Sequence, residues 1–379
     1  MINSDKKYNS FSGEPAVVSF LHAKARQDRT PVSGTFELTS RCNFNCKMCY
    51  VHNSQQRISA EDELSVDDWI KIAREARENG MVFLLLTGGE PLLRKDFEEI
   101  YLRLSEMGFI ISLNTNASLI DDKIIRLFEK IPPSRVNVSL YGTQPNTYKE
   151  LCGVECAEKV KENIKKLQSI GIGTVINYSC TPFNSDDVEN VVAFAKGNGL
   201  NIRASSYMYP CIRCSGGCTG QNEGRFSPAD AAKFRMKFDR LYYGEDDFLS
   251  RAERLAENVA SGSQPDIFAN DSVLCRAGTT SFWVDWQGNL SMCGMIPSGK
   301  RNILSDGFEK CWNETKTQTE KLRLYKGCTE CKYRFFCNVC AAVCLAETGE
   351  YDKKPEYVCE MTEETYNSVL DALCRKKGK

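Results

Sequence analysis

Short apolar runs alternate with amphipathic segments through the first two thirds of the chain. Each run is five or six residues long and rich in β-branched side chains, as expected for a strand buried in a parallel sheet. The runs are Thr35–Thr39, Met81–Leu86, Phe109–Leu113, Arg135–Leu140, Gly173–Tyr178 and Leu200–Ser205.

The segments between these runs have helical periodicity. Ser65, with Asp68 three residues later, has the pattern of an N-terminal cap and its acidic partner, and predicts a helix that runs towards Gly80. Six repeats of strand and then helix predict an α/β fold with a parallel sheet, either an open doubly wound sheet or a partial barrel. Four further helices are expected at about Lys95–Met107, Asp121–Lys130, Ala157–Ser169 and Asp186–Asn198.

The alternation ends after the sixth run. Residues 227–270 are charged and helical in pattern, with Pro228 placed as an early helical residue. Beyond them Gly and Cys become frequent, and Phe282–Trp286 and Leu290–Cys293 have the pattern of a hairpin. We therefore expect an N-terminal segment over 1–34, a strand-and-helix domain over 35–226, a helical bridge over 227–270 and a small Cys-rich domain over 271–379.

Charge and hydropathy exclude two classes of partner. Lys and Arg total 49 against 50 Asp and Glu, and no strongly basic stretch suggests nucleic acid. The longest apolar run near a strand, Met81–Leu86, is far shorter than the roughly 20 residues that a bilayer crossing needs. The polar start, Met1–Pro15, lacks the features of a secretory signal. We expect a cytoplasmic protein with no nucleic-acid or membrane partner.

The chain has 19 cysteines, and in a reducing compartment this number favours metal ligation over a disulfide framework. The only histidines are His22 and His52, which nearly removes imidazole as a general base or a main metal ligand. Thiolate is therefore the expected ligand chemistry. Cysteines without ligand spacing are expected to be free thiols. These are Cys152, Cys156, Cys180, Cys311 and Cys374.

Three cysteines follow the first strand with the spacing CxxxCxxC, at Cys42, Cys46 and Cys49. Three thiolates this close can bind three irons of a [4Fe–4S] cube and leave the fourth iron open to an outside ligand. A structural zinc site would need a fourth local ligand, and His52 stands at no characteristic offset.

This motif resembles that of the radical S-adenosylmethionine (SAM) superfamily, where it follows the first strand of a partial (β/α)6 barrel. The segment Thr87-Gly88-Gly89-Glu90-Pro91, after the second strand, is similar to the GGEP segment whose backbone and glutamate hold the amino group of SAM. Alone, Gly88 and Gly89 would fit an ordinary strand-to-helix turn. The resemblance implies an enzyme that cleaves SAM reductively to methionine and a 5′-deoxyadenosyl radical.

The resemblance also implies SAM contacts at the carboxyl ends of later strands, where ligands gather in such folds. The family often has an aromatic residue before the third cysteine, and this chain has Met48 there, so Met48 or Tyr50 is expected to pack on the adenine. The strand-end residues are Asn114, Asn116, Ser139, Arg203 and either Asn177 or Ser179. Arg203, Asn177 and Ser179 could instead be structural polar residues.

The C-terminal cysteines resemble a SPASM domain, which holds two auxiliary [4Fe–4S] clusters in many radical SAM peptide-modifying enzymes. The family pattern ends CxxxC, whereas here Cys340 comes one residue early and Cys344 three residues late. The resemblance implies three [4Fe–4S] clusters in all, with the following ligands. The outer cluster takes Cys328, Cys331, Cys337 and Cys359, and the inner one takes Cys275, Cys293 and either Cys340 or Cys344.

The fourth ligand of the inner cluster is open. It is the other member of the Cys340 and Cys344 pair, one of the cysteines that follow the sixth strand, or absent so that substrate can coordinate iron. Those cysteines are Cys211, Cys214 and Cys218, which are also candidates for a further cluster or for relay thiols. The alternative for the whole C-terminal block is a pair of zinc sites.

Auxiliary clusters suit the oxidative modification of a peptide. The segment Tyr141-Gly142, with Tyr148 and Gly153, resembles that of enzymes which crosslink ribosomal peptides, so we expect a maturase that forms a thioether or other crosslink. Sulfatase maturases usually have an aspartate where this chain has Gly294. The alternatives are epimerisation, sulfatase maturation, small-molecule or cofactor maturation, and a non-catalytic iron–sulfur or zinc scaffold.

The resemblance implies a peptide substrate and an electron donor of the flavodoxin or ferredoxin type. About 34 residues precede the first strand, too few for the winged-helix leader-recognition domain often fused to such enzymes. A separate leader-recognition protein or direct substrate binding is therefore expected.

Overall fold

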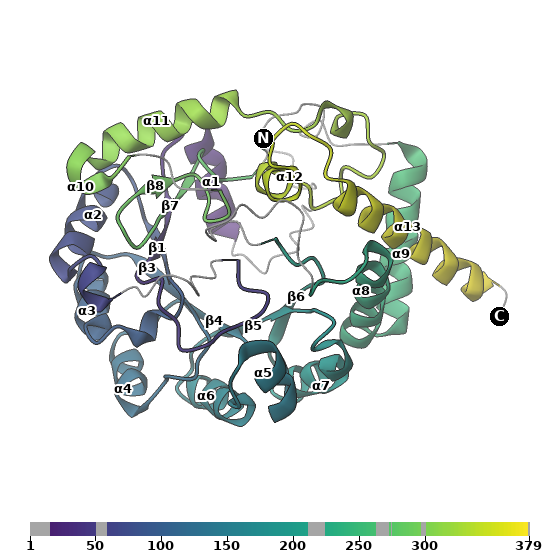
Figure 1. Cartoon of the computed structure of the whole chain (residues 1–379), viewed down its shortest axis with the longest axis horizontal. Coiled ribbons are helices and arrows are strands. Elements are labelled where there is room, and N and C mark those ends of the chain that lie inside the picture. Colours follow the sequence, from purple (N-terminus) through teal and green to yellow (C-terminus); the bar gives the residue numbers. More distant parts are fainter. Residues whose placement is uncertain are drawn as a thin grey trace.

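The computed structural model describes residues 16–50, 59–210, 224–262, 273, 275–296 and 301–377. Their core is one eight-stranded sheet with the order β6-β5-β4-β3-β2-β1-β7-β8, curved into a partial barrel (Figure 1). The strands are β1 Ser33–Glu37, β2 Phe83–Thr87, β3 Ile110–Thr115, β4 Arg135–Ser139, β5 Thr174–Ser179, β6 Asn201–Ser205, β7 Ser281–Val284 and β8 Leu290–Ser291.

Strands β1 to β6 are all parallel to their neighbours, which confirms the six strands expected from the apolar runs. Helices follow each strand and cover the outer face of the barrel (Figure 1). The helices of this part are α1 Ala16–Asp28, α2 Val66–Glu78, α3 Phe97–Glu106, α4 Asp122–Lys130, α5 Pro145–Cys152, α6 Ala157–Ser169 and α7 Val188–Gly197.

Local sequence explains where these helices begin and end. Ser65 and Asp68 form the expected capping box of α2, each side chain bonding the other residue's backbone N–H. Two helices were not expected, α1 and α5. Helix α5 opens at Pro145, suited to the first helical position, and closes at Gly153, whose φ of 74° is left-handed.

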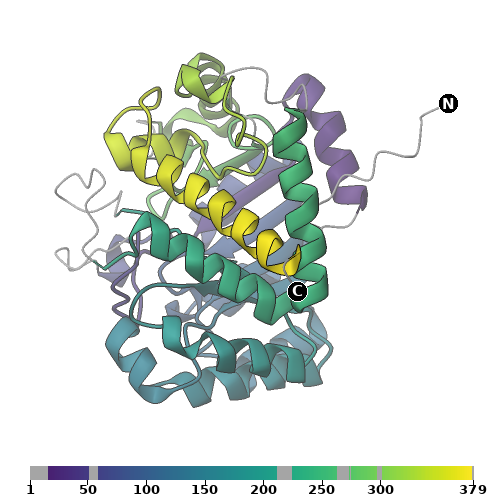
Figure 2. The ribbon, with the colours of Figure 1, turned by 90° about the vertical axis from the view of Figure 1, so that its right-hand side faces the viewer.

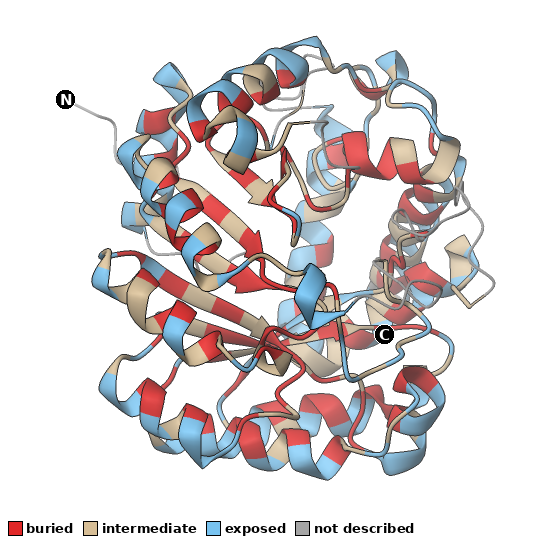
Figure 3. Cartoon of the chain, turned by 60° about the vertical axis from the view of Figure 1, so that its left-hand side comes forward, coloured by how far each residue is buried: buried red, intermediate tan, exposed pale blue. Residues whose placement is uncertain are grey.

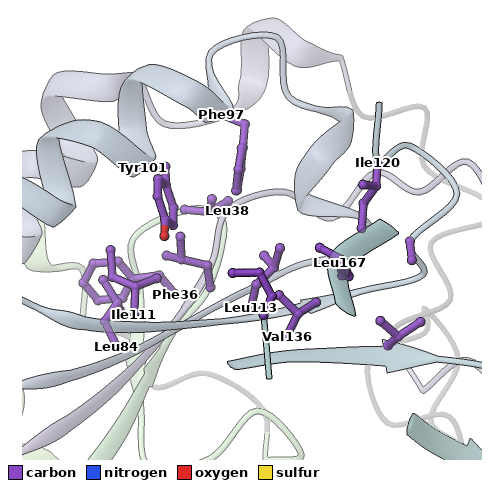
Figure 4. Packing of buried hydrophobic residues seen from close by; sticks show 14 of the residues in the cluster. Phe36, Leu38, Leu84, Phe97, Tyr101, Ile111, Leu113, Ile120, Val136 and Leu167 are labelled. Carbon is purple, nitrogen blue, oxygen red and sulfur yellow. The ribbon is translucent and has the colours of Figure 1, made fainter. Parts of the chain in front are cut away.

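The two faces of the sheet differ. The outward side chains of the strands are buried under the helices, and Figure 4 shows Phe97 and Tyr101 of α3 opposite Phe36 of β1. The inward positions, such as Ser112 and Asn114 on β3, are polar and half-buried, so burial alternates along the strands (Figure 3). The sheet therefore has one apolar face under the helices and one face around the barrel interior that is polar on most strands and apolar at Phe83 and Leu85 of β2.

The Cys-rich part continues the same sheet. Strand β7 pairs in parallel with β1, from Ser33 opposite Ser281, and β8 returns antiparallel to β7, which confirms the expected hairpin. The bridge consists of two helices, α8 Pro228–Tyr243 and α9 Glu245–Ser261, with Ser227 as the cap of α8. The remaining helices are α10 Ile303–Asp306, α11 Phe308–Lys321, α12 Ala341–Thr348 and α13 Glu356–Lys377.

The last helix ties the two parts together, because α13 packs along α8 and crosses α9 (Figure 2). At the other side α1 packs against the start of β7, where buried His22 bonds the hydroxyls of Thr280 and Ser33 at 2.8 and 2.9 Å. The predicted domain boundary at residue 271 lies outside the described residues and stays a prediction, although strands from both sides of it share one sheet. In the described part of the chain, no helix is long and apolar enough to cross a membrane.

Candidate active site

The CxxxCxxC loop leaves β1 at the carboxyl edge of the sheet and is held against the end of α5. The N–H groups of Asn45 and Lys47 donate to the carbonyls of Cys152 and Leu151, both at 2.9 Å. These two bonds flank Cys46 on either side. Cys49 N–H donates to the carbonyl of Cys46 at 3.1 Å and turns the chain back on itself. The backbone around the middle cysteine is therefore fixed by the protein.

The three thiols influence one another electrostatically. Desolvation of the sulfur, with smaller contributions from the nearby Glu90, Cys46 and Cys49, raises the pKa of Cys42 to about 12, while the N–H of Phe44, 3.4 Å away, opposes the shift. The Cys46 thiol is hydrogen-bonded to the buried Cys152 thiol, and this bond together with burial raises its pKa. Binding to iron would have to displace these protons.

Within the described ranges, no group of three Cys, His, Asp or Glu side chains is already arranged around a metal position. The donor chemistry nevertheless fits a [4Fe–4S] cluster. All three cysteines are free rather than in disulfides, and Cys42 is exposed. The three thiols lie on one short loop at the carboxyl edge of the sheet, beside the barrel interior.

A buried charge network braces the residue before the first cysteine. Arg41 donates two hydrogen bonds to Glu63, both at 2.8 Å, and Glu63 is only 3 % exposed. The Glu63 carboxylate also accepts the hydroxyl of Thr39 and pairs with Arg94 at 3.6 Å. Arg94 in turn donates to the carbonyl of Leu38 at 2.9 Å. Bidentate pairing of this kind fixes direction as well as distance.

Two glycines allow the turn after β2 to lie directly on this loop. The N–H groups of Gly89 and Glu90 donate to the carbonyls of Thr39 and Arg41, at 2.8 and 2.9 Å. A Cβ on Gly89 would stand 2.3 Å from the Arg41 carbonyl oxygen, and one on Gly88 would stand 2.5 Å from that of Thr39. Gly88 also has a φ of 158°. Close approach of two backbones is the physical reason for this Gly-Gly pair.

Glu90 points inward and its side chain is fully buried. Its carboxylate accepts hydrogen bonds from the N–H of Leu92 at 3.0 Å, the hydroxyl of Thr115 at 2.8 Å and the N–H of Asn116 at 2.7 Å. Burial outweighs these bonds and raises the pKa of Glu90 to about 7. Pro91 follows as the start of a short 3-10 turn, Pro91–Leu93. The described contacts of Glu90 join β2 to the end of β3.

Asn116 and Asn114 lie at the end of β3, as expected, but only Asn116 touches the cysteine loop. Its side-chain amide donates to Asn43 at 2.9 Å and approaches the Cys42 sulfur at 3.9 Å. Asn114 accepts a hydrogen bond from Asn137 of β4 at 2.8 Å. The Oδ1 atom of buried Asn137 has no hydrogen-bond partner within the described part of the chain. Sequence reasoning missed Asn137, although its inward register on β4 was available.

The other expected strand-end residues face the same interior. Ser139, Asn177 and Arg203 are register partners across β4, β5 and β6. Arg203 is exposed, and the other two are half-buried. The sequence singled out Tyr141 as part of a motif rather than as a site residue, yet its pKa is raised by burial and by the Cys46 thiol, so it lies close to that cysteine.

The remaining predicted adenine contacts are two half-buried side chains of the cysteine loop. Met48 packs against the main apolar core, and Tyr50 is the last residue described before the gap at 51–58. Both assignments stay predictions. His52 and the three cysteines Cys211, Cys214 and Cys218 lie outside the described residues, so their expected roles are not addressed by the structure.

One group of C-terminal thiols gathers around Tyr209, which follows β6. The hydroxyl of Tyr209 is hydrogen-bonded to Cys340, and the thiols of Cys293 and Cys275 are among the groups that raise its pKa, after burial. Burial raises the pKa of Cys275, and the Cys340 thiol raises it as well. Cys275, Cys293 and Cys340 thus lie near Tyr209, and Cys344 is not among the groups that act on it. The ligands of the inner cluster stay a prediction.

A second group comprises the cysteines expected for the outer cluster. Burial and the thiols of Cys337 and Cys331 raise the pKa of Cys328. Burial and the thiols of Cys337 and Cys328 raise the pKa of Cys359. Cys344 is fully buried, and burial is the main reason that its pKa is raised to about 12. The thiols of Cys328, Cys340 and Cys359 also raise this pKa, so Cys344 has neighbours in both sets of cysteines. The sequence alone left Cys340 and Cys344 equivalent.

A buried clamp fastens the Cys-rich part to the barrel. Arg225 donates to both carboxylate oxygens of Glu347 on α12, at 2.6 and 3.1 Å, and Tyr207 donates to the same carboxylate at 2.6 Å. The Arg225 guanidinium also stacks 3.7 Å from the centre of the Tyr357 ring. Glu347 is 4 % exposed and Arg225 11 %. The sequence offered no signal for this long-range contact.

These features define the class of protein. Residues 36–195 match the Radical SAM superfamily, and this range contains both the cysteine loop and the Gly-Gly turn packed on it. Residues 36–195 are therefore a radical SAM domain, and the chain is an enzyme. Such a domain implies SAM and one [4Fe–4S] cluster as cofactors.

Two relatives show how far the likeness extends along the chain. The AdoMet-dependent heme synthase of Methanosarcina barkeri is 25 % identical over 338 residues, which cover 85 % of this chain and 94 % of the relative. A "Probable GTP 3′,8-cyclase" of Sulfurisphaera tokodaii is 34 % identical over 169 residues, or 43 % of this chain and 52 % of the relative. The match to the cyclase thus spans about half of its length.

Two solved structures share the fold. SuiB of Streptococcus suis, bound to S-adenosylmethionine, superposes with a TM-score of 0.66 at 17 % identity, covering 90 % of this chain and 81 % of SuiB. Native anSMEcpe with bound AdoMet gives 0.67 at 19 % identity, covering 92 % of this chain and all of the other. Because the superposed range includes most of the chain, the fold likeness extends beyond the barrel into the Cys-rich part.

Proposed function

We propose that this enzyme oxidatively modifies a peptide, forming a thioether or other crosslink during ribosomal peptide maturation. The observation that supports this most is that the Cys-rich part holds two sets of neighbouring cysteines. One set is Cys275, Cys293 and Cys340, and the other is Cys328, Cys331, Cys337 and Cys359. SuiB has been crystallised with the precursor peptide SuiA and anSMEcpe with the Cp18Cys peptide. Both share this fold.

We assign three [4Fe–4S] clusters to the chain. The SAM-binding cluster takes Cys42, Cys46 and Cys49, and the inner auxiliary cluster takes Cys275, Cys293 and Cys340. The outer auxiliary cluster takes Cys328, Cys331, Cys337 and Cys359. Cys344 is left as a buried thiol between the auxiliary groups. When bound, SAM and its cluster supply the 5′-deoxyadenosyl radical that abstracts a hydrogen atom from the substrate.

The chain's own residues position the reactants. The Glu63 network and the end of α5 hold the cysteine loop, so its thiols keep a fixed direction relative to the barrel interior. The inward polar residues of the strands line the space in which SAM and the substrate would meet. We assign SAM contacts to the predicted set Met48, Tyr50, Gly88, Gly89, Glu90, Pro91, Asn114, Asn116, Ser139, Asn177 and Arg203, and add Asn137.

The bond-forming step needs a place for two electrons. Joining a substrate carbon to a substrate thiol removes one hydrogen from each and releases two electrons in total. One electron would leave with the hydrogen atom that 5′-deoxyadenosine gains, the thiol proton would go to solvent, and a bound auxiliary cluster would accept the second electron. The partners are then an electron donor of flavodoxin or ferredoxin type and a peptide, which binds either directly or through a separate leader-recognition protein.

The first experiment measures iron, sulfide and 5′-deoxyadenosine after anaerobic reconstitution. We expect about twelve irons per chain. The triple variant Cys42→Ala, Cys46→Ala, Cys49→Ala is expected to lack about four irons and all SAM cleavage. Zinc in place of iron, or cleavage that survives the triple change, contradicts the proposal and leaves the non-catalytic scaffold as the better explanation.

The second experiment tests the substrate class. The peptide encoded nearest to the gene is incubated with the reconstituted enzyme, SAM and reductant, and its mass is followed. A crosslink lowers the mass by two hydrogens, and epimerisation leaves it unchanged but incorporates deuterium from heavy water. A peptide that changes in neither way, with 5′-deoxyadenosine still formed, argues against peptide maturation.

Small-molecule maturation is the second candidate. The heme synthase aligns along 94 % of its length, whereas the peptide-bound structures support fold alone. A direct comparison gives the enzyme either a haem precursor or the peptide and measures product by mass spectrometry. Conversion of the haem precursor, without change in the peptide, would favour this second function.

A further inference from the structure

A basic cavity lies beside the amino end of β7, where the end of α1 meets the end of α11. Its volume is about 270 Å³. It is lined by Arg26 of α1 and by Arg29, the residue directly after α1. Glu320 of α11, Arg323 just beyond α11 and Thr279 just before β7 line it as well. Segments far apart in the sequence thus place three guanidinium groups around one space.

The cavity carries a net positive charge, although the whole chain has a net charge of −1. Three of its lining residues are arginines and one is a glutamate, which gives +3 and −1, a net charge of +2. Guanidinium groups stay charged at physiological pH and form paired hydrogen bonds with carboxylates. A hollow lined by one sign of charge attracts ions of the opposite sign. The cavity therefore suits an anionic group.

The fold holds Arg29 at the cavity. Its φ of 53° is left-handed, a conformation that a residue with a side chain rarely adopts. The carbonyl of Arg29 accepts the indole N–H of buried Trp312 at 3.0 Å, and its guanidinium donates to the carbonyl of Lys316 at 3.2 Å. Both partners belong to α11. These bonds fix the end of α1 against α11 and keep Arg29 between the two helices.

Backbone carbonyls also hold the other two arginines. Arg323 donates to the carbonyls of Glu320 and Leu322, at 2.6 and 2.8 Å. Arg26 donates to the carbonyl of Cys275 at 3.5 Å. Capping the end of α11 is an ordinary role for Arg323. Capping alone does not explain why arginines from two separate helices meet around one cavity.

The turn before β7 packs closely against α11 behind the cavity. Gly278 in this turn has a φ of 64°, and a Cβ there would overlap the hydroxyl of Thr319. Thr319 and Thr279 both line the cavity and are buried. The hydroxyl of Thr319 donates to the carbonyl of Thr315 at 2.8 Å. Packed elements of the fold therefore fix the shape of the cavity on this side.

Glu320 shows which kind of anion the cavity accepts. Its carboxylate pairs with Arg29 at 2.8 Å, while its side chain is 57 % exposed. One of the three guanidinium groups thus already holds a carboxylate. We propose that the cavity binds an acidic side chain of the peptide substrate, whose carboxylate pairs with Arg26 and Arg323. This inference rests on the proposed function, because it concerns how the same peptide is held.

The position of the cavity makes it a docking site rather than part of the reaction centre. Strands β1 and β7 are parallel, with Ser33 opposite Ser281. The cysteine loop leaves the carboxyl end of β1, whereas the cavity lies at the amino end of this pair. The five residues of β1 span about 16 Å. The acidic side chain therefore belongs to a part of the peptide at least about five extended residues away from the reacting one.

The test measures binding by fluorescence anisotropy, with the reconstituted enzyme and no SAM. The probe is fluorescein-labelled hexaglutamate, and labelled hexaglutamine is the neutral control. We expect hexaglutamate alone to bind, and more weakly as salt is added. Arg26→Gln with Arg323→Gln should weaken its binding by about tenfold or more. Arg126→Gln with Lys159→Gln removes the same charge from exposed positions of α4 and α6, and should stay within about twofold of wild type.

Glu320→Gln gives a test in the opposite direction. It removes the carboxylate that competes for Arg29, so hexaglutamate should bind several times more tightly. A purely structural role of the arginines predicts no such gain. This single change at an exposed residue also keeps the inference testable if the double arginine variant does not fold.

Several outcomes would overturn the inference. They are wild-type affinity in the double arginine variant, an equal loss in the control pair, and unchanged or weaker binding in Glu320→Gln. Displacement of hexaglutamate by inorganic phosphate at lower concentrations than by acetate would indicate a phosphate site instead. Equal competition by free glutamate and by unlabelled hexaglutamate would indicate a small carboxylate ligand instead of a peptide.

The failure of this inference can be told apart from the failure of the proposed function. With the natural peptide, the double arginine variant should raise KM and leave kcat unchanged. If the peptide is crosslinked but this variant has the KM of wild type, only the docking inference fails. If hexaglutamate binds as expected but no peptide is modified, the proposed function fails and the charge-dependent site stands.

Discussion

The cysteine loop after β1 and the Cys-rich part differ in what holds their thiols. The loop bonds to the turn after β2 and to the end of α5, both far away in sequence, and packs on the main core. In the Cys-rich part the backbone hydrogen bonds near the outer-cluster cysteines are local, such as Cys328 N–H to the carbonyl of Tyr325 at 2.9 Å and Cys337 N–H to that of Tyr333 at 3.0 Å. The apolar clusters there are also smaller.

This difference suggests that the two regions depend on metal to different extents. A site held by tertiary hydrogen bonds keeps its backbone when the cluster is removed. A site held by short turns and a small core gains much of its stability from metal ligation, because metal binding contributes directly to folding. Variants that disturb each region can test this difference, and their expected effects differ in size.

The largest effect is expected from removing outer-cluster ligands. Cys328→Ala with Cys337→Ala should lose about four irons and leave the turns that carry these two cysteines open to protease, because local backbone bonds alone then hold them. Limited proteolysis with mass spectrometry should locate the new cuts beyond residue 272. The triple variant of Cys42, Cys46 and Cys49 is the control, and it should resist protease like wild type. Equal sensitivity of both would remove the contrast.

The clamp between the regions comes next. Arg225→Ala leaves the carboxylate of Glu347 buried beside the Tyr207 hydroxyl without its cationic partner, and should lower the free energy of unfolding by about 3–5 kcal/mol. Lys376→Ala breaks an ion pair with Glu253 that also joins the Cys-rich part to α9 but is 48 % exposed on each side. Its cost should stay below about 1 kcal/mol. Denaturant unfolding of the two variants distinguishes a buried clamp from surface charge.

Stability should depend on pH through Glu90. Its pKa is about 7 in the folded chain against 4.5 ordinarily, because burial disfavours the charged form. The folded chain therefore binds the proton more tightly, and stability falls as pH rises from about 4.5 to 7, by about 3 kcal/mol at most. Glu90→Gln should flatten this slope in the cluster-free protein, measured by denaturant unfolding at several pH values. An unchanged slope would mean that Glu90 is already charged at low pH.

The sequence predicted the features that depend on neighbouring residues. Six strands, the cap at Ser65 and the CxxxCxxC loop all follow from local pattern and spacing, and strand ends agree within a few residues. Contacts between distant segments were not predictable. Neither the meeting of Cys46 with Cys152 nor the choice of Cys340 beside Tyr209 leaves a trace in spacing, because both depend on how helices and turns pack.

The smallest effect concerns the close contact between the two turns of the barrel edge. Gly89→Ala places a Cβ 2.3 Å from the Arg41 carbonyl oxygen, which belongs to backbone and cannot rotate away. The loop must shift, at a cost of about 1–3 kcal/mol typical of overpacking. Gly197→Ala is the matched control, because nothing lies within 4 Å of its Cβ and it ends α7. That change should be neutral or stabilising by up to about 1 kcal/mol.

The two alanine variants also bear on the contrast between the regions. If the loop is held by its backbone contacts, Gly89→Ala should lower cluster occupancy at Cys42, Cys46 and Cys49 while the auxiliary iron stays. Iron content and the electron paramagnetic resonance signal that changes when SAM is added would measure this. Full occupancy in a measurably destabilised Gly89→Ala protein would show that cluster binding, rather than the backbone contacts, determines the conformation of the loop. The loop and the Cys-rich part would then depend on metal in the same way.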